Sequence, residues 1–176
     1  MNPEPQGCTG MSPRLILPGL LAALMGAGAA VAQTAEDAAN LTSGIKACMA
    51  AAGDPAAISA AFVAAGWTPD TNAEEGLIDF AAPAASDQSA FAFIADDGSF
   101  CHVESLTTGN AALADILAAT LKSEGWETAE PGKDSDGCTL LDLGDSITAT
   151  LTSGSNDPTC FSDTDSAVRF EYGREQ

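Results

Sequence analysis

The chain has little with which to build a catalytic centre. Its 176 residues include one histidine, His102, so a Ser-His or Cys-His nucleophile would have to use it. His102 falls in the middle of an expected strand, where a lone histidine is more often packed than catalytic. Carboxylate pairs arise by chance in a chain with 25 Asp and Glu residues, so they do not indicate a glycosidase. We therefore expect no catalytic residue and no cofactor, and we keep a small carboxylate-based hydrolase as an alternative.

Basic residues are scarce as well. Six Lys and Arg residues stand against 25 Asp and Glu residues, which gives a formal net charge of −19. Such a surface repels nucleic acid and anionic lipid, and it speeds encounter with cationic partners. The same excess of acid would also keep a protein soluble in a salty habitat without any partner. The charge thus argues against nucleic-acid binding and leaves a cationic partner and simple solubility as two interpretations.

Only one long apolar run is present, and it lies near the N-terminus. It follows Met11, extends from Leu15 to about Ala30, and leads into small residues that end at Ala32. This order predicts a secretory signal peptide, preceded by an upstream extension of ten residues. Because the run contains glycine and proline and falls short of the roughly 20 apolar residues that cross a bilayer, a membrane anchor is the less favoured alternative. We expect a periplasmic or extracellular protein without a stable membrane anchor after cleavage.

No cysteine pair has the close Cys-x-x-Cys spacing that is typical of zinc sites. After the predicted signal peptide the chain keeps an even number of cysteines, which an oxidising compartment allows to pair in three ways: Cys48, Cys101, Cys138 and Cys160. We favour Cys48 with Cys101 and Cys138 with Cys160, because each pair then lies within one half of the chain.

Two acidic segments could supply oxygen ligands to a metal. The first, Asp134-Ser135-Asp136-Gly137, resembles a calcium loop, but its glycine stands at the fourth position instead of the sixth and no Glu closes the loop at the twelfth. The second surrounds Cys160 and consists of Asp157, Asp163 and Asp165. Solvated loop charge explains both segments. We expect no metal site, and we keep a weak calcium-dependent structural or adhesion module as an alternative function.

Helix and strand signals predict a single α+β domain over residues 33–176. Helices are expected after Thr34, from the Asp54-Pro55 cap to Gly66, and from Asn110 to Gly125. Gly44 argues against one continuous helix in the first of these regions. Strands are expected at residues 77–81, 90–95, 100–105, 138–143, 146–152 and 167–172. Helices on one face of an antiparallel sheet follow from these elements.

The order of these elements repeats along the chain. A Gly-Trp dipeptide follows the second helix and again the third, and aligning the two dipeptides at an offset of 59 superposes Cys101 on Cys160. We expect two tandem halves, residues 33–107 and 108–176, related by an internal duplication. Two ordinary helices that each end at a glycine are the alternative.

The Asp97-Gly98 dipeptide predicts the register of the first hairpin. It favours a two-residue type I′ turn, in which both central residues have positive φ, and it places Phe93 opposite His102. One face of the hairpin then carries the four residues that we predict to bind a partner: Phe91, Phe93, Phe100 and His102.

The other face of this hairpin carries Cys101. If Cys101 bonds Cys48 on a helix, that face belongs to the core and the aromatic face is left on the opposite side. An exposed aromatic patch within an acidic rim is typical of a partner-binding site, whereas a second layer of the protein could instead cover it. We therefore expect a secreted or periplasmic acidic protein that binds a protein or peptide partner, with a cationic partner as one candidate and inhibitor-like action as one mode.

Overall fold

The computed structural model describes residues 22–70, 76–83, 89–126, 130–154 and 158–173. The chain divides into two compact units, Met1–Ala32 and Gln33–Gln176, and the second contains the whole sheet. The predicted upstream extension and the start of the predicted signal peptide lie outside the described residues. Among the helices of the described residues, none combines the length and the hydropathy needed to cross a membrane.

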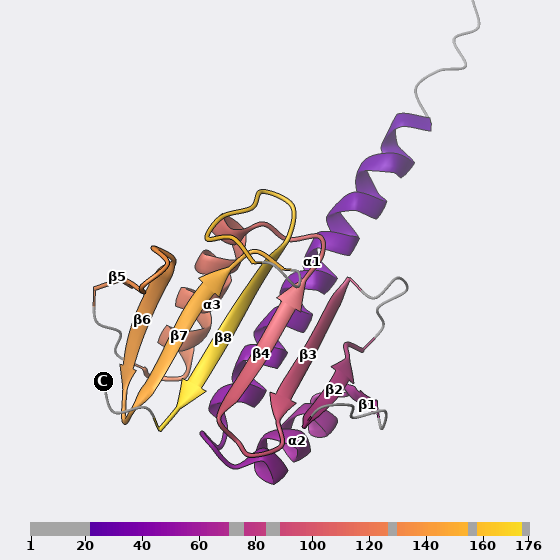
Figure 1. Cartoon of the computed structure of the whole chain (residues 1–176). Helices are drawn as coiled ribbons and strands as arrows, with labels where there is room; N and C mark the ends of the chain where they lie inside the picture. The colour runs from indigo at the N-terminus through magenta and orange to yellow at the C-terminus, as the bar shows by residue number, and fades with distance from the viewer. Residues whose placement is uncertain (1–21, 71–75, 84–88, 127–129, 155–157, 174–176) are drawn as a thin grey trace, which may run out of the picture. The chain divides into compact units, whose positions relative to one another are not determined.

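Helices and antiparallel strands make up the described chain, which confirms the α+β class (Figure 1). The helices are α1 (Ala22–Met49), α2 (Pro55–Ala64) and α3 (Asn110–Ser123). The strands are β1 (Thr68–Asp70), β2 (Leu77–Ala81), β3 (Ala90–Ala95), β4 (Phe100–Ser105), β5 (Gly132–Lys133), β6 (Thr139–Gly144), β7 (Ile147–Thr152) and β8 (Ser166–Tyr172). They form one sheet in the order β1-β2-β3-β4-β8-β7-β6-β5, so the two halves of the chain meet where β4 pairs with β8.

Side-chain capping determines where α2 begins. The carboxylate of Asp54 accepts hydrogen bonds from the backbone N–H groups of Ala56 and Ala57 at 3.0 and 3.1 Å, and Pro55 occupies the first turn. Gly66 follows the helix at φ +88°, a conformation that glycine adopts without strain. The helix predicted from these residues is confirmed.

The helix α3 ends as α2 does. Gly125 has φ +80°, and the N–H of Trp126 donates to the carbonyl of Leu121 at 2.9 Å. In α2 the N–H of Trp67 donates to the carbonyl of Phe62 at 3.0 Å. The repeated Gly-Trp dipeptide therefore marks the same helix ending twice.

Gly44 weakened the prediction of one continuous helix in the first region, yet α1 is continuous through it. A Cβ atom placed on Gly44 would lie 2.9 Å from Cγ1 of Val103 on β4. The glycine lets the helix approach the sheet closely, and this packing outweighs the low helix propensity of glycine.

The β3–β4 turn has the expected register but not the expected type. Phe93 pairs with His102, as predicted. Of the two predicted turn residues only Gly98 has positive φ, +73°, and its N–H donates to the carbonyl of Ala95 at 3.0 Å. The carboxylate of Asp97 accepts from the N–H of Ser99 at 2.9 Å, so Asp97 stabilises a longer loop instead of entering the left-handed region.

A two-residue turn with both central residues at positive φ occurs instead between β6 and β7. Asp145 has φ 49° and Ser146 has φ 61°, while Gly144 pairs directly with Ile147. This is the backbone arrangement of a type I′ turn.

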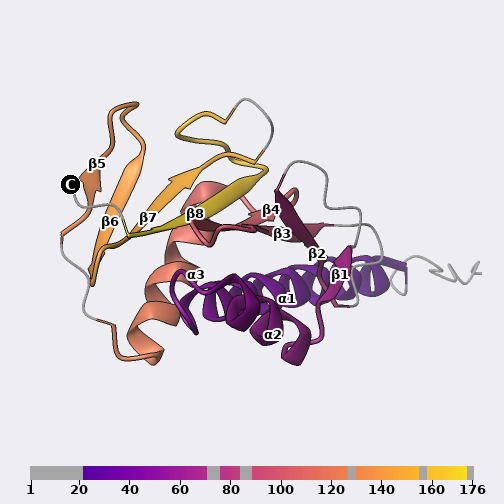
Figure 2. The ribbon, with the colours of Figure 1, turned by 60° about the horizontal axis from the view of Figure 1, so that its bottom comes forward.

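The helices pack against one face of the sheet and form the core there (Figure 2). Along β3 and β7 the core side chains alternate with those of the opposite face, as expected for strands with one face on the core. The largest fully buried side chains are Phe62, Phe80, Phe170, Leu41, Ile45, Ile58, Ile94, Leu113, Leu117, Leu121, Val103 and Val168. We call the face of the sheet turned away from the helices the outer face.

The sequence did not predict two short strands, β1 and β5. β1 contains Pro69, which lacks a backbone N–H, and β5 has two residues. Both lie at the edges of the sheet, where pairing on one side is sufficient, so neither needs the alternating pattern by which central strands are recognised.

Two disulfides stabilise the domain, in the pairing favoured from the sequence. Cys48–Cys101 joins α1 to β4 inside the core, and Cys138–Cys160 joins the residue before β6 to the loop between β7 and β8. Both are consistent with an oxidising environment. The two disulfides do not occupy equivalent positions, since Cys101 lies within a strand and Cys160 in a loop, so they do not confirm the internal duplication.

Candidate protein-binding face

The four predicted site residues share the outer face of the sheet. Phe91 and Phe93 come from β3, Phe100 and His102 come from β4, and all four side chains are half-buried. Within the described residues of Gln33–Gln176 no helix covers this face, because the helices pack on the other side (Figure 2). No helix of the described residues therefore forms a second layer here, but part of the outer face is nevertheless buried, with Glu104 4 % and Ala167 0 % exposed.

A groove of about 760 Å³ runs over the outer face. Its aromatic side consists of Phe91, Phe93 and His102, whereas Phe100 is not among its lining residues. The opposite side comes from the second half of the chain and includes Leu140 on β6. Sites for small molecules typically measure roughly 300 to 1,000 Å³, so the groove can hold a few side chains of a partner.

The outer face continues from the aromatic cluster across β8 to β7. Ala167 on β8 and Thr152 on β7 lie in the row that continues from Phe91 through Glu104 across the sheet. Thr150 and Thr152 belong to the alternating threonines of β7, which turn the same way as the phenylalanines.

The aromatic rings contact one another along the two strands. The ring centres of Phe93 and His102 lie 4.3 Å apart with an interplanar angle of 21°. Phe100 meets Phe93 edge to face at 6.0 Å, and Phe91 lies nearly parallel to Phe93 at 6.5 Å. The predicted site residues therefore form one contiguous aromatic cluster.

His102 contacts a buried carboxylate that sequence reasoning did not include in the site. Its Nε2–H donates to Oε2 of Glu104 at 3.3 Å, and the side chains are 13 % and 5 % exposed. Gly154 packs so closely on Glu104 that a Cβ there would clash with the carboxylate. His102 is thus held by Phe93 on one side and by Glu104 on the other, and among the described residues neither contact offers a hydroxyl or thiol that it could activate.

Arg169 is the second residue of the candidate site that the sequence did not single out. Its guanidinium carbon lies 3.8 Å from the centre of the Phe100 ring, and its Nε lies 3.4 Å from Oε1 of Glu171. Arg169 pairs with His102 in the β4–β8 ladder. Its alternation with Val168 and Phe170 was visible in the sequence, but only the pairing of β8 with β4 places it beside the aromatic cluster.

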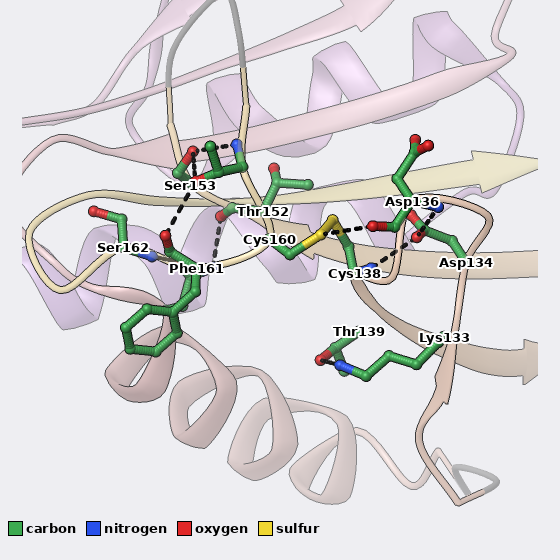
Figure 3. The surroundings of a disulfide bond; sticks show 12 residues. Lys133, Asp134, Asp136, Cys138, Thr139, Thr152, Ser153, Cys160, Phe161 and Ser162 are labelled. Atoms are coloured by element: carbon green, nitrogen blue, oxygen red, sulfur yellow. Dashed lines mark hydrogen bonds between the residues drawn. A yellow bond between two sulfur atoms is a disulfide. The ribbon is translucent and has the colours of Figure 1, made fainter.

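An acidic rim closes the groove on the side of β6. Asp134, Asp136 and Pro158 line it from two loops that the Cys138–Cys160 disulfide joins (Figure 3). The carboxylate of Asp134 accepts from the N–H groups of Asp136 and Cys138 at 3.0 and 2.8 Å. Hydrogen bonds and the disulfide together give the rim a defined shape.

The described acidic residues do not converge on a metal site. In the ranges that the structure describes, no group of three or more His, Cys, Asp or Glu side chains is placed to hold an ion. Asp157 of the second predicted cluster lies outside the described residues. Asp165 instead accepts a hydrogen bond from the hydroxyl of Ser162, which lowers the pKa of that carboxyl.

The outer face thus combines a contiguous aromatic cluster with an acidic rim. Comparison of the chain with protein-family models, with curated proteins and with solved structures finds no match.

Proposed function

We propose that this protein is an exported binding protein whose outer sheet face captures a partner protein or peptide. The observation that carries the proposal is the groove of about 760 Å³, which combines an aromatic side with a disulfide-bonded acidic rim. Half-buried aromatic side chains on a sheet face without a covering helix are the usual anchors of a protein interface.

The partial burial of Phe93 supports a binding role. Phe80 is 1 % exposed and stacks on Phe62 at 4.6 Å in the core, whereas Phe93 is half-buried on the outer face and its ring lies against Phe91, Phe100 and His102. Phe80→Ala should therefore reduce the free energy of unfolding by about 3 to 5 kcal/mol. Phe93→Ala should reduce it by only about 1 to 2 kcal/mol, because less apolar surface leaves water when that ring packs.

Affinity capture with the oxidised domain as bait tests the proposal. The bait, residues 33–176, is incubated with the extracytoplasmic fraction of the source cells, and the retained protein is compared between variants. Phe93→Ala should abolish capture, because a central aromatic anchor commonly contributes roughly 2 kcal/mol or more to binding. Val63→Ala is the control, since Val63 is 53 % exposed on α2, which packs on the opposite face.

Two outcomes would contradict the proposed function. The first is equal capture by the wild type and by Phe93→Ala. The second is a loss of stability for Phe93→Ala as large as that for Phe80→Ala, which would make Phe93 a core residue.

Export is the other part of the proposal. A signal peptide that ends near Ala32 would deliver the chain to the periplasm or the outside, where the two disulfides form. Intact mass of the exported protein should begin at Gln33 and lie four hydrogen masses below the fully reduced value. Free thiols or a retained leader would contradict this.

An internal duplication would explain the symmetric sheet order. Each half contains a helix that ends at Gly-Trp, followed by four strands that run inward from an edge of the sheet. Under this proposal each half supplies one side of the groove, and the two disulfides arose independently after the duplication.

A further inference from the structure

The three phenylalanines of the outer face differ in what stacks on them. The guanidinium of Arg169 lies over Phe100 at 3.8 Å, and the imidazole of His102 lies 4.3 Å from Phe93. Within the described residues, no basic side chain lies over Phe91. The outer face therefore holds two aromatic–basic pairs and a third ring without such a neighbour.

The orientation of Phe91 can be deduced from that of Phe93. The two rings are nearly parallel, at an interplanar angle of 21°, and the Phe93 ring turns its face across the ladder toward His102. In the same ladder Phe91 pairs with Glu104. The Phe91 ring therefore presents its face to the space beside the Glu104 carboxylate.

The charge around this space is negative. Glu104 is 4 % exposed at the groove floor, and the same groove is lined by Asp134, Asp136 and Glu171. Arg169 balances these carboxylates only in part. An ammonium or guanidinium group would be attracted by both the carboxylates and the negative face of the ring, whereas an anion would be repelled.

We propose that Phe91 and Glu104 form the subsite that receives a lysine or arginine side chain of the partner. This inference rests on the proposed function and names the chemistry of its partner, a basic segment of a protein. Arg169 over Phe100 shows within the same face how a guanidinium packs on such a ring.

Three synthetic octapeptides test the subsite by NMR titration of the oxidised domain at low salt. The first alternates threonine with lysine, the second carries acetylated lysine, and the third carries glutamate in place of lysine. The lysine peptide should shift the backbone amide signals of Phe91 and Glu104. The acetylated peptide should bind more weakly, because it keeps the length of the side chain but loses the charge, and the glutamate peptide should not bind.

Two pairs of variants locate the interaction. Phe91→Leu keeps an apolar side chain but removes the ring, and it should weaken the lysine peptide by about 2- to 30-fold, while Phe91→Trp should preserve or strengthen binding. Asp136→Asn should weaken it by about two- to fivefold. Asp115→Asn makes the same change in net charge on an exposed position of α3, at the opposite face, and should have no effect. Melting curves confirm that each variant is folded.

The inference is overturned if the lysine and acetylated peptides bind equally, if the lysine peptide gives no shifts, or if Asp115→Asn weakens binding as much as Asp136→Asn. The last result would mean attraction to net charge alone. Capture of a native partner that depends on Phe93 but not on Phe91 or on salt would leave the proposed function intact and refute the cationic subsite. Peptide binding at Phe91, together with capture that does not depend on Phe93, would support the cationic subsite and refute the proposed function.

Discussion

Tyr172, the one tyrosine of the chain, makes the stability of the core sensitive to alkaline pH. It lies in β8 on the core face, and its hydroxyl donates to the backbone carbonyl of Cys48 in α1 at 2.6 Å. Burial disfavours the phenolate and raises the pKa of Tyr172 above its ordinary value of 10.0.

The direction of the pH dependence follows from this shift. Because the folded-state pKa is raised, the stability contributed by Tyr172 is fully present below the unfolded pKa of about 10 and is lost as pH rises toward the folded value. Each pH unit above the unfolded pKa removes about 1.4 kcal/mol, so the free energy of unfolding should be about 1.4 kcal/mol lower at pH 11 on account of this group.

Tyr172→Phe isolates the effect. At neutral pH the variant should be less stable than the wild type by about 1 kcal/mol, because the hydrogen bond to Cys48 is lost. Its stability should lack the pH dependence caused by Tyr172. In urea denaturation between pH 8 and pH 11 the wild type should therefore lose its advantage, and the two stability curves should cross just below pH 11.

Ultraviolet absorbance reports the same group directly, since no other tyrosine contributes. The folded protein should show no phenolate absorbance at pH 10, whereas the urea-unfolded chain should titrate near that pH. A phenolate that forms in the folded protein with a midpoint near pH 10, or parallel stability curves for the two proteins, would refute the reasoning.

Two further predictions concern the loops. Gly98→Val should destabilise the fold by more than about 1 kcal/mol, because Gly98 has positive φ and a Cβ there would clash with the carbonyl of Gly53. Gly137 also has positive φ but lies in open space, so Gly137→Val should lower the melting temperature less, and equal effects of the two variants would mean that the contact with Gly53 is unimportant. Replacing Cys138 and Cys160 together by serine should lower stability by about 3.4 kcal/mol by loop closure and should also weaken capture in the affinity assay. Undiminished capture by that double variant would show that the rim does not take part in binding.

Local signals were sufficient to predict most of the fold. Asp54-Pro55 and the two Gly-Trp dipeptides mark helix ends through hydrogen bonds between near neighbours, and the helices lie where these residues predicted. Gly44 misled the prediction because its role depends on Val103, a contact across a long stretch of sequence.

The candidate site could be predicted only on its β3–β4 side. The hairpin register placed Phe93 beside His102, since a short loop joins the two strands. Arg169 and Leu140 join the groove through the pairing of β8 with β4 and through the sheet order, and neither pairing leaves a local signal in the sequence.

The Cys138–Cys160 disulfide also makes completion of the groove depend on oxidation of the chain. The two loops that it joins supply Asp134, Asp136 and Pro158, so a chain whose thiols are still reduced lacks the covalent link between the parts of the rim. Such a nascent chain would have the aromatic side of the groove without a covalently linked acidic rim. Under the proposed export, this link would form only after the chain has left the cell interior, and the proposed capture competence would be acquired there.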